Sequence, residues 1–266
     1  MGILINTTPA IKNLYEEVRI KGLERYEKIV HNLRTLNAQS IQEQYSFLSQ
    51  DQLTDNYQNL LEFVTKAIND NPEKAAIAFI RLAKNNANIK TEFAAHEKLS
   101  VVNPILSKNR HSVRKVILNV YHSFYLDFKE KNVTVFIFNS EKKVVFDYET
   151  IRLALYHLLS NISKYIKRNS NLQIGIKDSE GEFSIFFDME SIHIEKDEVQ
   201  KIFEDNYSGI KVRAANKQGK GLGMGLIKKA LTLNDATIEV IPGDGINTKN
   251  KVDYSNNKFI ISFKID

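Results

Sequence analysis

The sequence predicts an α+β protein, in which an N-terminal antiparallel helical hairpin is followed by an α/β sandwich whose mixed sheet is covered by helices on one face. Two observations support this prediction. Before Gly175, glycine and proline are scarce, and apolar residues recur three or four positions apart over long stretches. After about Arg110, the pattern changes to helices interleaved with short alternating strands. We therefore expect two domains, at residues 1–110 and 111–266.

Two long helices are predicted in the first domain. One covers residues 10–49, where apolar side chains stand at helical spacing: Leu14, Val18, Tyr26, Ile29, Leu33 and Leu36. The other covers residues 71–102 and begins with Asn71 as a cap and Pro72 in the first turn. Residues 50–70 are expected to form a short helix with turns. Because two amphipathic helices bury their apolar faces by pairing, we expect a hairpin that forms a four-helix bundle in a homodimer.

The second domain is predicted to alternate between helices and strands. Helical periodicity marks residues 113–131, 148–169, 194–205 and 219–234. Alternating or apolar runs mark strands at residues 132–140, 142–147, 172–178, 182–190, 236–242 and 257–265. The third and fourth strands are expected to form a hairpin around residues 179–181.

The composition excludes several classes of protein. Apolar residues make up 42% and charged residues 26%, as in globular proteins. No apolar run reaches the roughly 20 residues that span a bilayer, and the N-terminus turns polar too early for a secretory signal, so we expect a cytoplasmic protein. The absence of cysteine excludes disulfides and thiolate metal sites. The net charge of +5 comes without a helix-turn-helix or zinc pattern, so nucleic acid is not an expected partner.

A glycine run, Gly219-Lys220-Gly221-Leu222-Gly223, comes directly before a predicted helix. Glycines let backbone amides approach an anion closely, and a helix N-terminus adds partial positive charge. The run is not a P-loop, because no Gly-Lys-Ser/Thr ending follows a strand. A phosphate-bearing ligand would also explain the nearby basic residues Lys211, Arg213, Lys217 and Lys220. The alternative is a flexible loop before a helix.

Three further residues carry suitable chemistry. Asn161 and Lys164 share one face of a helix, where an amide oxygen suits hydrated Mg²⁺ and an ammonium suits phosphate. Asp188 follows an apolar strand, where a carboxylate can accept a hydrogen bond from an adenine amino group. The alternatives are a solvated helix face and an aspartate in a turn at the strand end.

Together, and in this order, the motifs resemble those of histidine kinases, whose ATPase fold is shared with gyrase, Hsp90 and MutL. The segment LLSNISKY, residues 158–165, resembles the N box of that family. FFDME falls where the first glycine box lies, and KIFED, with Phe203, resembles the F box. GKGLGMGLIKKALTLNDATIEV resembles the second glycine box and the strand beyond it. The resemblance covers about 150 residues.

The resemblance implies an ATP site with Mg²⁺. Asn161 would hold the metal, Lys164 would contact phosphate, and Tyr165 would flank the nucleotide. Asp188 would bind adenine, and the triphosphate would be lined by Gly219, Lys220, Gly221, Leu222 and Gly223. Residues 206–218 would form a lid over the nucleotide. The chain departs from the family where Met189, Glu190, Ser191 and Ile192 replace the usual Asn-Gly-x-Gly, and where His157 replaces a frequent asparagine.

A histidine kinase also needs a phosphoacceptor histidine. His31 opens HNLRTLNAQ, which resembles the H box of the family. By that resemblance, Asn32 stands where an acid usually takes the proton, and Thr35 stands where a residue places water for dephosphorylating the partner. Leu36 replaces the usual proline. His96, in AAHEKLS, is the weaker alternative acceptor.

These expectations lead to three hypotheses. The first is a histidine kinase that phosphorylates His31 and passes the phosphoryl group to a response regulator aspartate. The second is a nucleotide-gated switch without phosphotransfer, motivated by the glycines missing after Asp188 and the acid missing after His31. The third is a protein serine kinase of the anti-sigma type, which the long helical hairpin disfavours.

Overall fold

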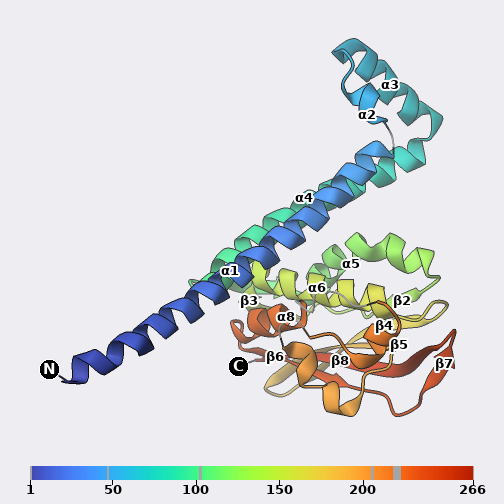
Figure 1. Ribbon diagram of the computed structural model, residues 1–266. Coiled ribbons are helices and arrows are strands. Elements are labelled where there is room, and N and C mark those ends of the chain that lie inside the picture. The colour runs from blue at the N-terminus through green and yellow to red at the C-terminus, as the bar shows by residue number, and fades with distance from the viewer. Residues whose placement is uncertain (1, 47, 102–103, 205–206, 218–222, 266) are drawn as a thin grey trace. The chain divides into compact units, whose positions relative to one another are not determined.

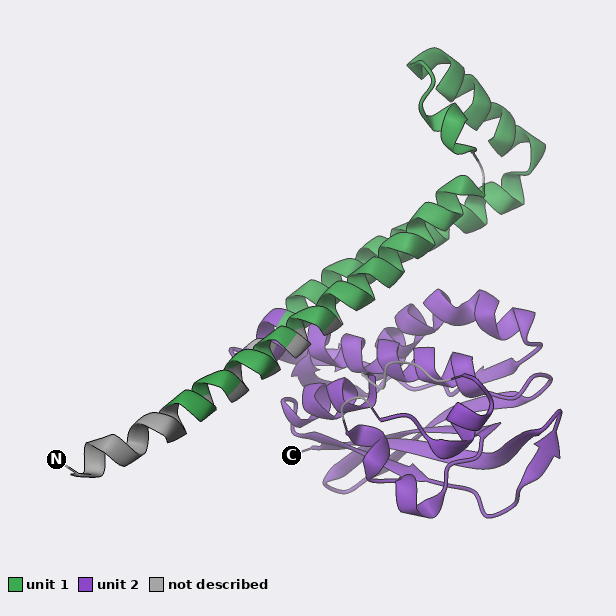
Figure 2. Cartoon of the chain, in the orientation of Figure 1, with its two compact units in different colours: residues 1–96 green, residues 97–266 purple. Residues whose placement is uncertain are grey.

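The computed structural model describes residues 2–46, 48–101, 104–204, 207–217 and 223–265. The chain divides into two compact units, residues 1–96 and 97–266 (Figure 2). Residues 97–110, which the sequence analysis assigned to the first domain, therefore belong to the second unit. No helix in the described part of the chain is both long and apolar enough to cross a bilayer.

The first unit is helical, as predicted. It contains α1 (Gly2–Tyr45), α2 (Gln50–Leu53), α3 (Tyr57–Asp70) and most of α4 (Pro72–Ser100). Polar contacts join α1 and its following turn to α4; for example, Arg81 Nη1 lies 2.5 Å from Glu43 Oε1, and Lys74 Nζ donates to the Ser46 carbonyl at 2.8 Å. Asn71 Oδ1 accepts from the Lys74 amide at 2.9 Å, which confirms the predicted cap.

The second unit contains the predicted mixed sheet. Its strands are β2 (Thr134–Ile137), β4 (Asn171–Ser179), β5 (Glu182–Ile192), β8 (Val252–Lys264) and β6 (Ala236–Ile241), in that spatial order. β2 and β4 are parallel, and the other pairs are antiparallel. β7 (Asn247–Lys249) extends the sheet beside β8. A separate antiparallel pair joins β1 (Lys108–Ser112) to β3 (Lys143–Asp147).

Three helices cover one face of this sheet: α5 (Val113–Glu130), α6 (Tyr148–Tyr165) and α8 (Gly223–Thr232) (Figure 1). Ser112 and Asp147 cap α5 and α6 by accepting amide hydrogen bonds. Alternate residues of β5 point at the helices and are almost fully buried, namely Phe183, Ile185, Phe187 and Met189. They meet an apolar face of α6 that includes Leu155, Leu158 and Leu159.

The region after β5 differs from the prediction. Residues 194–205 were expected to form a helix, but the described part contains two 3₁₀ turns, Lys196–Glu198 and Lys201–Phe203. The Glu198 carboxylate accepts from the Ile210 amide, twelve residues further along, at 2.7 Å. This long-range bond draws the chain back on itself. The short helix α7 (Ile210–Ala214) then lies within the predicted lid.

Candidate functional site

The structure brings two of the predicted motifs together at the C-terminal half of α6. Asn161, half-buried on α6, faces Gly223, the first residue of α8. A methyl group added to Gly223 would lie 3.3 Å from Asn161 Nδ2 and 3.7 Å from Oδ1. The start of a glycine-initiated helix therefore abuts an amide side chain. The other predicted phosphate-binding residues, Gly219, Lys220, Gly221 and Leu222, lie outside the described residues.

Lys164 and Tyr165 close the same end of α6. The Lys164 ammonium lies 5.2 Å from the centre of the Tyr165 ring, within range of a cation–π interaction. Partial burial lowers the pKa of Lys164 and raises the pKa of Tyr165. A phosphate beside Lys164 would stabilise the charged ammonium, which burial disfavours.

Lys131, which was not predicted from the sequence, holds this end of α6 in place. Its ammonium donates to the carbonyl oxygens of Ser163 and, at 3.0 Å, of Lys164. Burial, with the positive charge of Lys217 as the next cause, lowers the pKa of Lys131 to about 8. Lys131 thus satisfies carbonyls that a helix C-terminus leaves without partners. The available signal in the sequence was the position of Lys131 directly after a predicted helix, next to Asn132, whose backbone takes a left-handed conformation.

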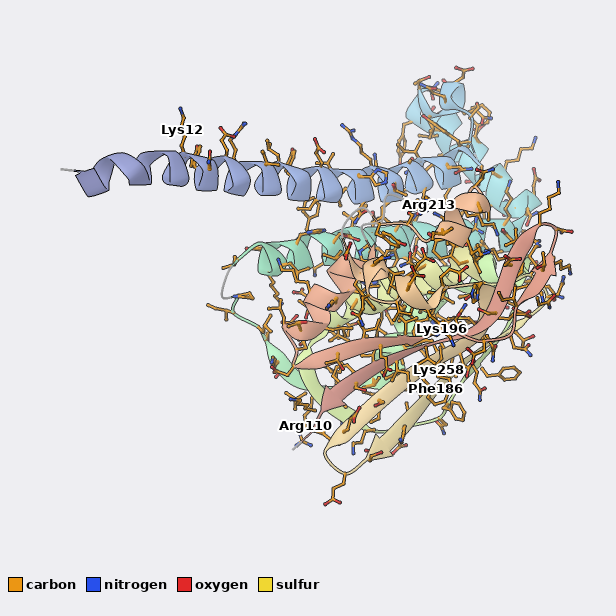
Figure 3. The ribbon with its side chains drawn as sticks, turned by 60° about the horizontal axis from the view of Figure 1, so that its bottom comes forward. Lys12, Arg110, Phe186, Lys196, Arg213 and Lys258 are labelled. Carbon is orange, nitrogen blue, oxygen red and sulfur yellow. The ribbon has the colours of Figure 1, made fainter. Side chains whose placement is uncertain are left out.

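Asp188 lies inside a strand and not at the strand end where it was predicted. It was expected at a strand end facing the nucleotide, but β5 continues to Ile192 and Asp188 lies within it. Strand alternation directs its side chain to the face opposite α6 and α8, where Lys258 Nζ approaches Asp188 Oδ2 at 2.9 Å. Lys258 also lies 5.4 Å from the centre of the Phe186 ring, on the open face shown in Figure 3. The residue that faces the helices here is Met189, 2% exposed.

A buried polar chain follows at the ends of β5 and β8. His193 Nδ1 lies 2.9 Å from Ser255 Oγ, which donates to Asn257 Oδ1 at 3.1 Å. Asn257 Nδ2 in turn donates to Ser191 Oγ at 2.9 Å. A β-bridge between Ile166 and Ser191 ties this chain to the end of α6. Ser191 belongs to the segment in which the first glycine box is altered, and His193 follows that segment. Ser255 and Asn257 come from β8, and single residues of this kind gave no signal in the sequence.

The segment after the second 3₁₀ turn is fixed at its base by a buried carboxylate. Glu198, 1% exposed, accepts from the Tyr207 hydroxyl at 2.5 Å and from the Ile210 amide at 2.7 Å. Burial and the bond to Glu198 raise the pKa of Tyr207 to about 12. Phe203 is half-buried, with the Lys228 ammonium of α8 5.6 Å from its ring centre. The predicted F box therefore contacts the same helix that begins at Gly223.

Known proteins resemble the second unit in sequence and in fold. A family model described as histidine kinase-, DNA gyrase B- and HSP90-like ATPase matches residues 146–264. Residues 146–264 are thus similar to the ATPase domains that this model describes. The match contains α6, the sheet from β4 onward and α8, so it includes Asn161, Lys164, Phe203 and Gly223.

Individual relatives of the ATPase domain are sensor kinases. Sensor protein SrrB of Staphylococcus aureus is 29% identical over 105 residues, which are 39% of this chain and only 18% of SrrB. The solved histidine kinase AdeS of Acinetobacter baumannii has a TM-score of 0.51 and 16% identity, covering 71% of this chain and 85% of that one. ShkA in complex with AMPPNP has a TM-score of 0.51 and 12% identity, covering 72% and 38%. The two solved structures support the fold.

The predicted phosphoacceptor region lies outside the ATPase domain, on α1. His31 is half-buried, and its carbonyl accepts from Thr35 Oγ1 at 3.0 Å, as along a regular helix. Asn32 Nδ2 lies 3.5 Å from Glu92 Oε2 on α4, and the same oxygen is 3.3 Å from His96 Nε2. His96 is only 8% exposed, whereas His31 is more accessible. In the hairpin, the Glu92 carboxylate of α4 therefore lies beside Asn32, the residue that follows His31.

Proposed function

We propose that this chain is an ATP-dependent protein histidine kinase, in which nucleotide bound to the ATPase domain phosphorylates His31. The observation that carries the proposal is the meeting of Asn161 with the glycine-started helix at Gly223. A helix N-terminus beside an amide and an ammonium suits a polyphosphate with its metal. The structure of ShkA with AMPPNP supports an adenine nucleotide as the ligand.

The side chains present fit Mg²⁺ held together with a nucleotide. Mg²⁺ keeps several waters and takes few protein ligands, so one amide oxygen, that of Asn161, is sufficient beside phosphate oxygens. Within the described ranges, no three His, Asp or Glu side chains gather as metal ligands. Bound Mg²⁺ would neutralise charge on the transferred phosphoryl group. Lys164 would contact the phosphates, and Tyr165 would flank the nucleotide.

The proposed reaction forms a bond between a ring nitrogen of His31 and the γ-phosphorus and breaks the bond to the leaving oxygen of ADP. The attacking nitrogen must be neutral, and the proton on the other nitrogen needs an acceptor or an orienting partner. Asn32 would orient the imidazole ring without accepting this proton, which would pass to water. The phosphoryl group would then move from the His31 nitrogen to an aspartate carboxylate of a response regulator. In the phosphatase direction, Thr35 of this chain would place the water that hydrolyses the aspartyl phosphate to phosphate.

Dimerisation through the hairpin and a cytoplasmic location belong to the same proposal. Large apolar side chains stand exposed on both long helices, among them Tyr15, Leu23 and Tyr26 on α1 and Phe79 and Phe93 on α4. Such side chains would be buried in a four-helix bundle formed by two copies. Light scattering of the intact chain tests this, since a monomer at micromolar concentration would contradict it.

The deciding experiment incubates the chain with γ-labelled ATP and Mg²⁺ and compares wild type, His31→Ala and His96→Ala. We expect label that is acid-labile and alkali-stable, absent in His31→Ala, retained in His96→Ala and abolished by EDTA. Label retained in His31→Ala would reject His31 as the acceptor. Acid-stable label on a partner protein would instead indicate a serine kinase.

A second candidate function is a nucleotide-gated switch without phosphotransfer. It is favoured by Asp188, whose carboxylate pairs with Lys258 on the opposite face of the sheet, and by Met189 on the helix-facing side. ATP binding without phosphohistidine, in the presence of Mg²⁺, would select this function over the kinase.

A further inference from the structure

The last turn of α4 belongs structurally to the second unit, and one lysine fastens it there. Lys98 Nζ lies 2.7 Å from Asp147 Oδ2 and 2.8 Å from Glu149 Oε2, at the beginning of α6. Lys98 is one-fifth exposed and Asp147 is 1% exposed. The pair is therefore shielded from water, unlike the surface ion pairs that contribute little.

Asp147 is the centre of this cluster. Its carboxylate also accepts from the Ser107 amide at 2.9 Å and from both the amide and the hydroxyl of Thr150 at 3.1 Å. Burial alone would raise the pKa of Asp147, but the bonds from Lys98, Thr150 and Ser107 outweigh it and lower the pKa. The carboxylate stays charged, so it needs a cation, and Lys98 supplies it.

The end of α8 joins the same cluster. Asn234 Oδ1, just beyond α8, accepts from the Asp147 amide at 2.7 Å, while Asn234 Nδ2 donates to Thr150 Oγ1 at 2.8 Å. Lys229, in the last turn of α8, donates to the carbonyl of Leu99, the neighbour of Lys98. The last turn of α4 is therefore held by the first turn of α6 and the last turn of α8.

The same two helices build the candidate phosphate site at their other ends. Asn161 and Lys164 lie near the end of α6, and Gly223 begins α8. With a rise of about 1.5 Å per residue, the helix axis rises about 9 Å from Gly223 to Lys229, the residue of α8 that contacts Leu99. The candidate phosphate site and the attachment of α4 thus lie at opposite ends of the same packed pair of helices.

We infer that Lys98 is a positioning residue for phosphoryl transfer, which fastens the helix of the hairpin to the two helices that bind the nucleotide. This inference rests on the proposed kinase function. Lys98 touches neither nucleotide nor His31 in this role, and it acts by keeping the end of α4 on Asp147. Loss of its ammonium should therefore slow phosphorylation of His31 and leave nucleotide binding intact.

The test compares Lys98→Met, Lys98→Arg and the control Lys108→Met in the full chain. Met retains the length of the side chain without charge, and Arg retains the charge. Lys108 pairs with Asp235 at 2.6 Å, but that aspartate is 76% exposed, so this ion pair of the same segment should matter little. Each variant is measured for the affinity of ATP and for the rate of His31 labelling at saturating ATP.

We expect Lys98→Met to label at least tenfold more slowly, with an ATP affinity within twofold of wild type. Lys98→Arg should remain within threefold of wild type in both the labelling rate and the affinity for ATP. Lys108→Met should match wild type in both quantities. Equal labelling by Lys98→Met and wild type overturns the inference alone. A parallel loss of ATP affinity in Lys98→Met also overturns it, since it indicates a general structural role. No label in wild type overturns the proposed kinase function and this inference with it.

Discussion

Gly223, the first residue of α8, faces the amide of Asn161 so closely that an added methyl group would lie 3.3 Å from Asn161 Nδ2. This spacing leaves little room for a side chain between the helix N-terminus and α6. Because backbone amides at such a terminus bind anions only at close approach, the missing side chain at Gly223 has a direct role in the candidate site.

Gly223→Ala is therefore expected to weaken nucleotide binding about tenfold while leaving the fold intact. Alanine favours a helix over glycine by up to about 1 kcal/mol, so the melting temperature should hold or rise. Calorimetric titration with ATP and thermal melting measure the two effects. Gly22→Ala, where nothing lies within 4 Å of the added methyl, is the control and should leave the affinity for ATP unchanged.

Asp188→Asn is expected to change the affinity for ATP by less than twofold. The carboxylate lies on the open face of the sheet with Lys258, and both side chains are partly exposed, so the pair contributes roughly 0–1 kcal/mol. The same titration provides the test. A tenfold loss would mean that Asp188 turns toward the nucleotide, and would restore the role that the family resemblance implies.

The sequence predicted the regular parts of the fold because they depend on local signals. The caps at Asn71, Ser112 and Asp147 begin helices where polar side chains precede apolar periodicity. The position of Asp188 was missed for a different reason. A carboxylate after an apolar run looks like a strand end, but pairing with β8 carries β5 on to Ile192. Such pairing depends on residues far away in the sequence.

The contacts that hold the end of α4 could not be predicted from local sequence either. Lys98 and Asp147 are 49 residues apart, and Asn234 reaches Thr150 across 84 residues. A single lysine or asparagine carries no sign of its distant partner, since most are solvated. By contrast, Asn161 and the glycine run could be predicted, because each group has a chemistry and spacing that suit one ligand.

Lys131 should leave a signature in the pH dependence of stability. Its pKa is lowered from 10.5 to about 8 on folding, so the unfolded chain holds more protons between these values. Stability from this group therefore rises as pH increases from about 8 to 10.5. The free energy of unfolding of wild type minus that of Lys131→Met, from urea titrations, should increase over this range. A constant difference would contradict the burial of the ammonium.

Glu198 is expected to hold the base of the predicted lid. Its carboxylate accepts from the Tyr207 hydroxyl and the Ile210 amide through one oxygen, and from the Glu195 amide at 3.4 Å through the other. Glutamine keeps the shape of the side chain but replaces one of the two oxygens with an NH₂ group, which cannot accept a hydrogen bond from these donors. Glu198→Gln should therefore cost about 1–3 kcal/mol and speed hydrogen exchange in the segment that follows.

Tyr207→Phe provides the matched comparison, because it removes one donor and leaves the Ile210 amide bonded to Glu198. Hydrogen exchange over residues 207–217 should then accelerate less than in Glu198→Gln, and dissociation of ATP should follow the same order. If Glu198→Gln exchanges as slowly as wild type, the carboxylate does not hold the segment. If the two variants exchange equally fast, the Tyr207 hydroxyl carries the whole effect, and the amide of Ile210 contributes nothing to the order of the lid.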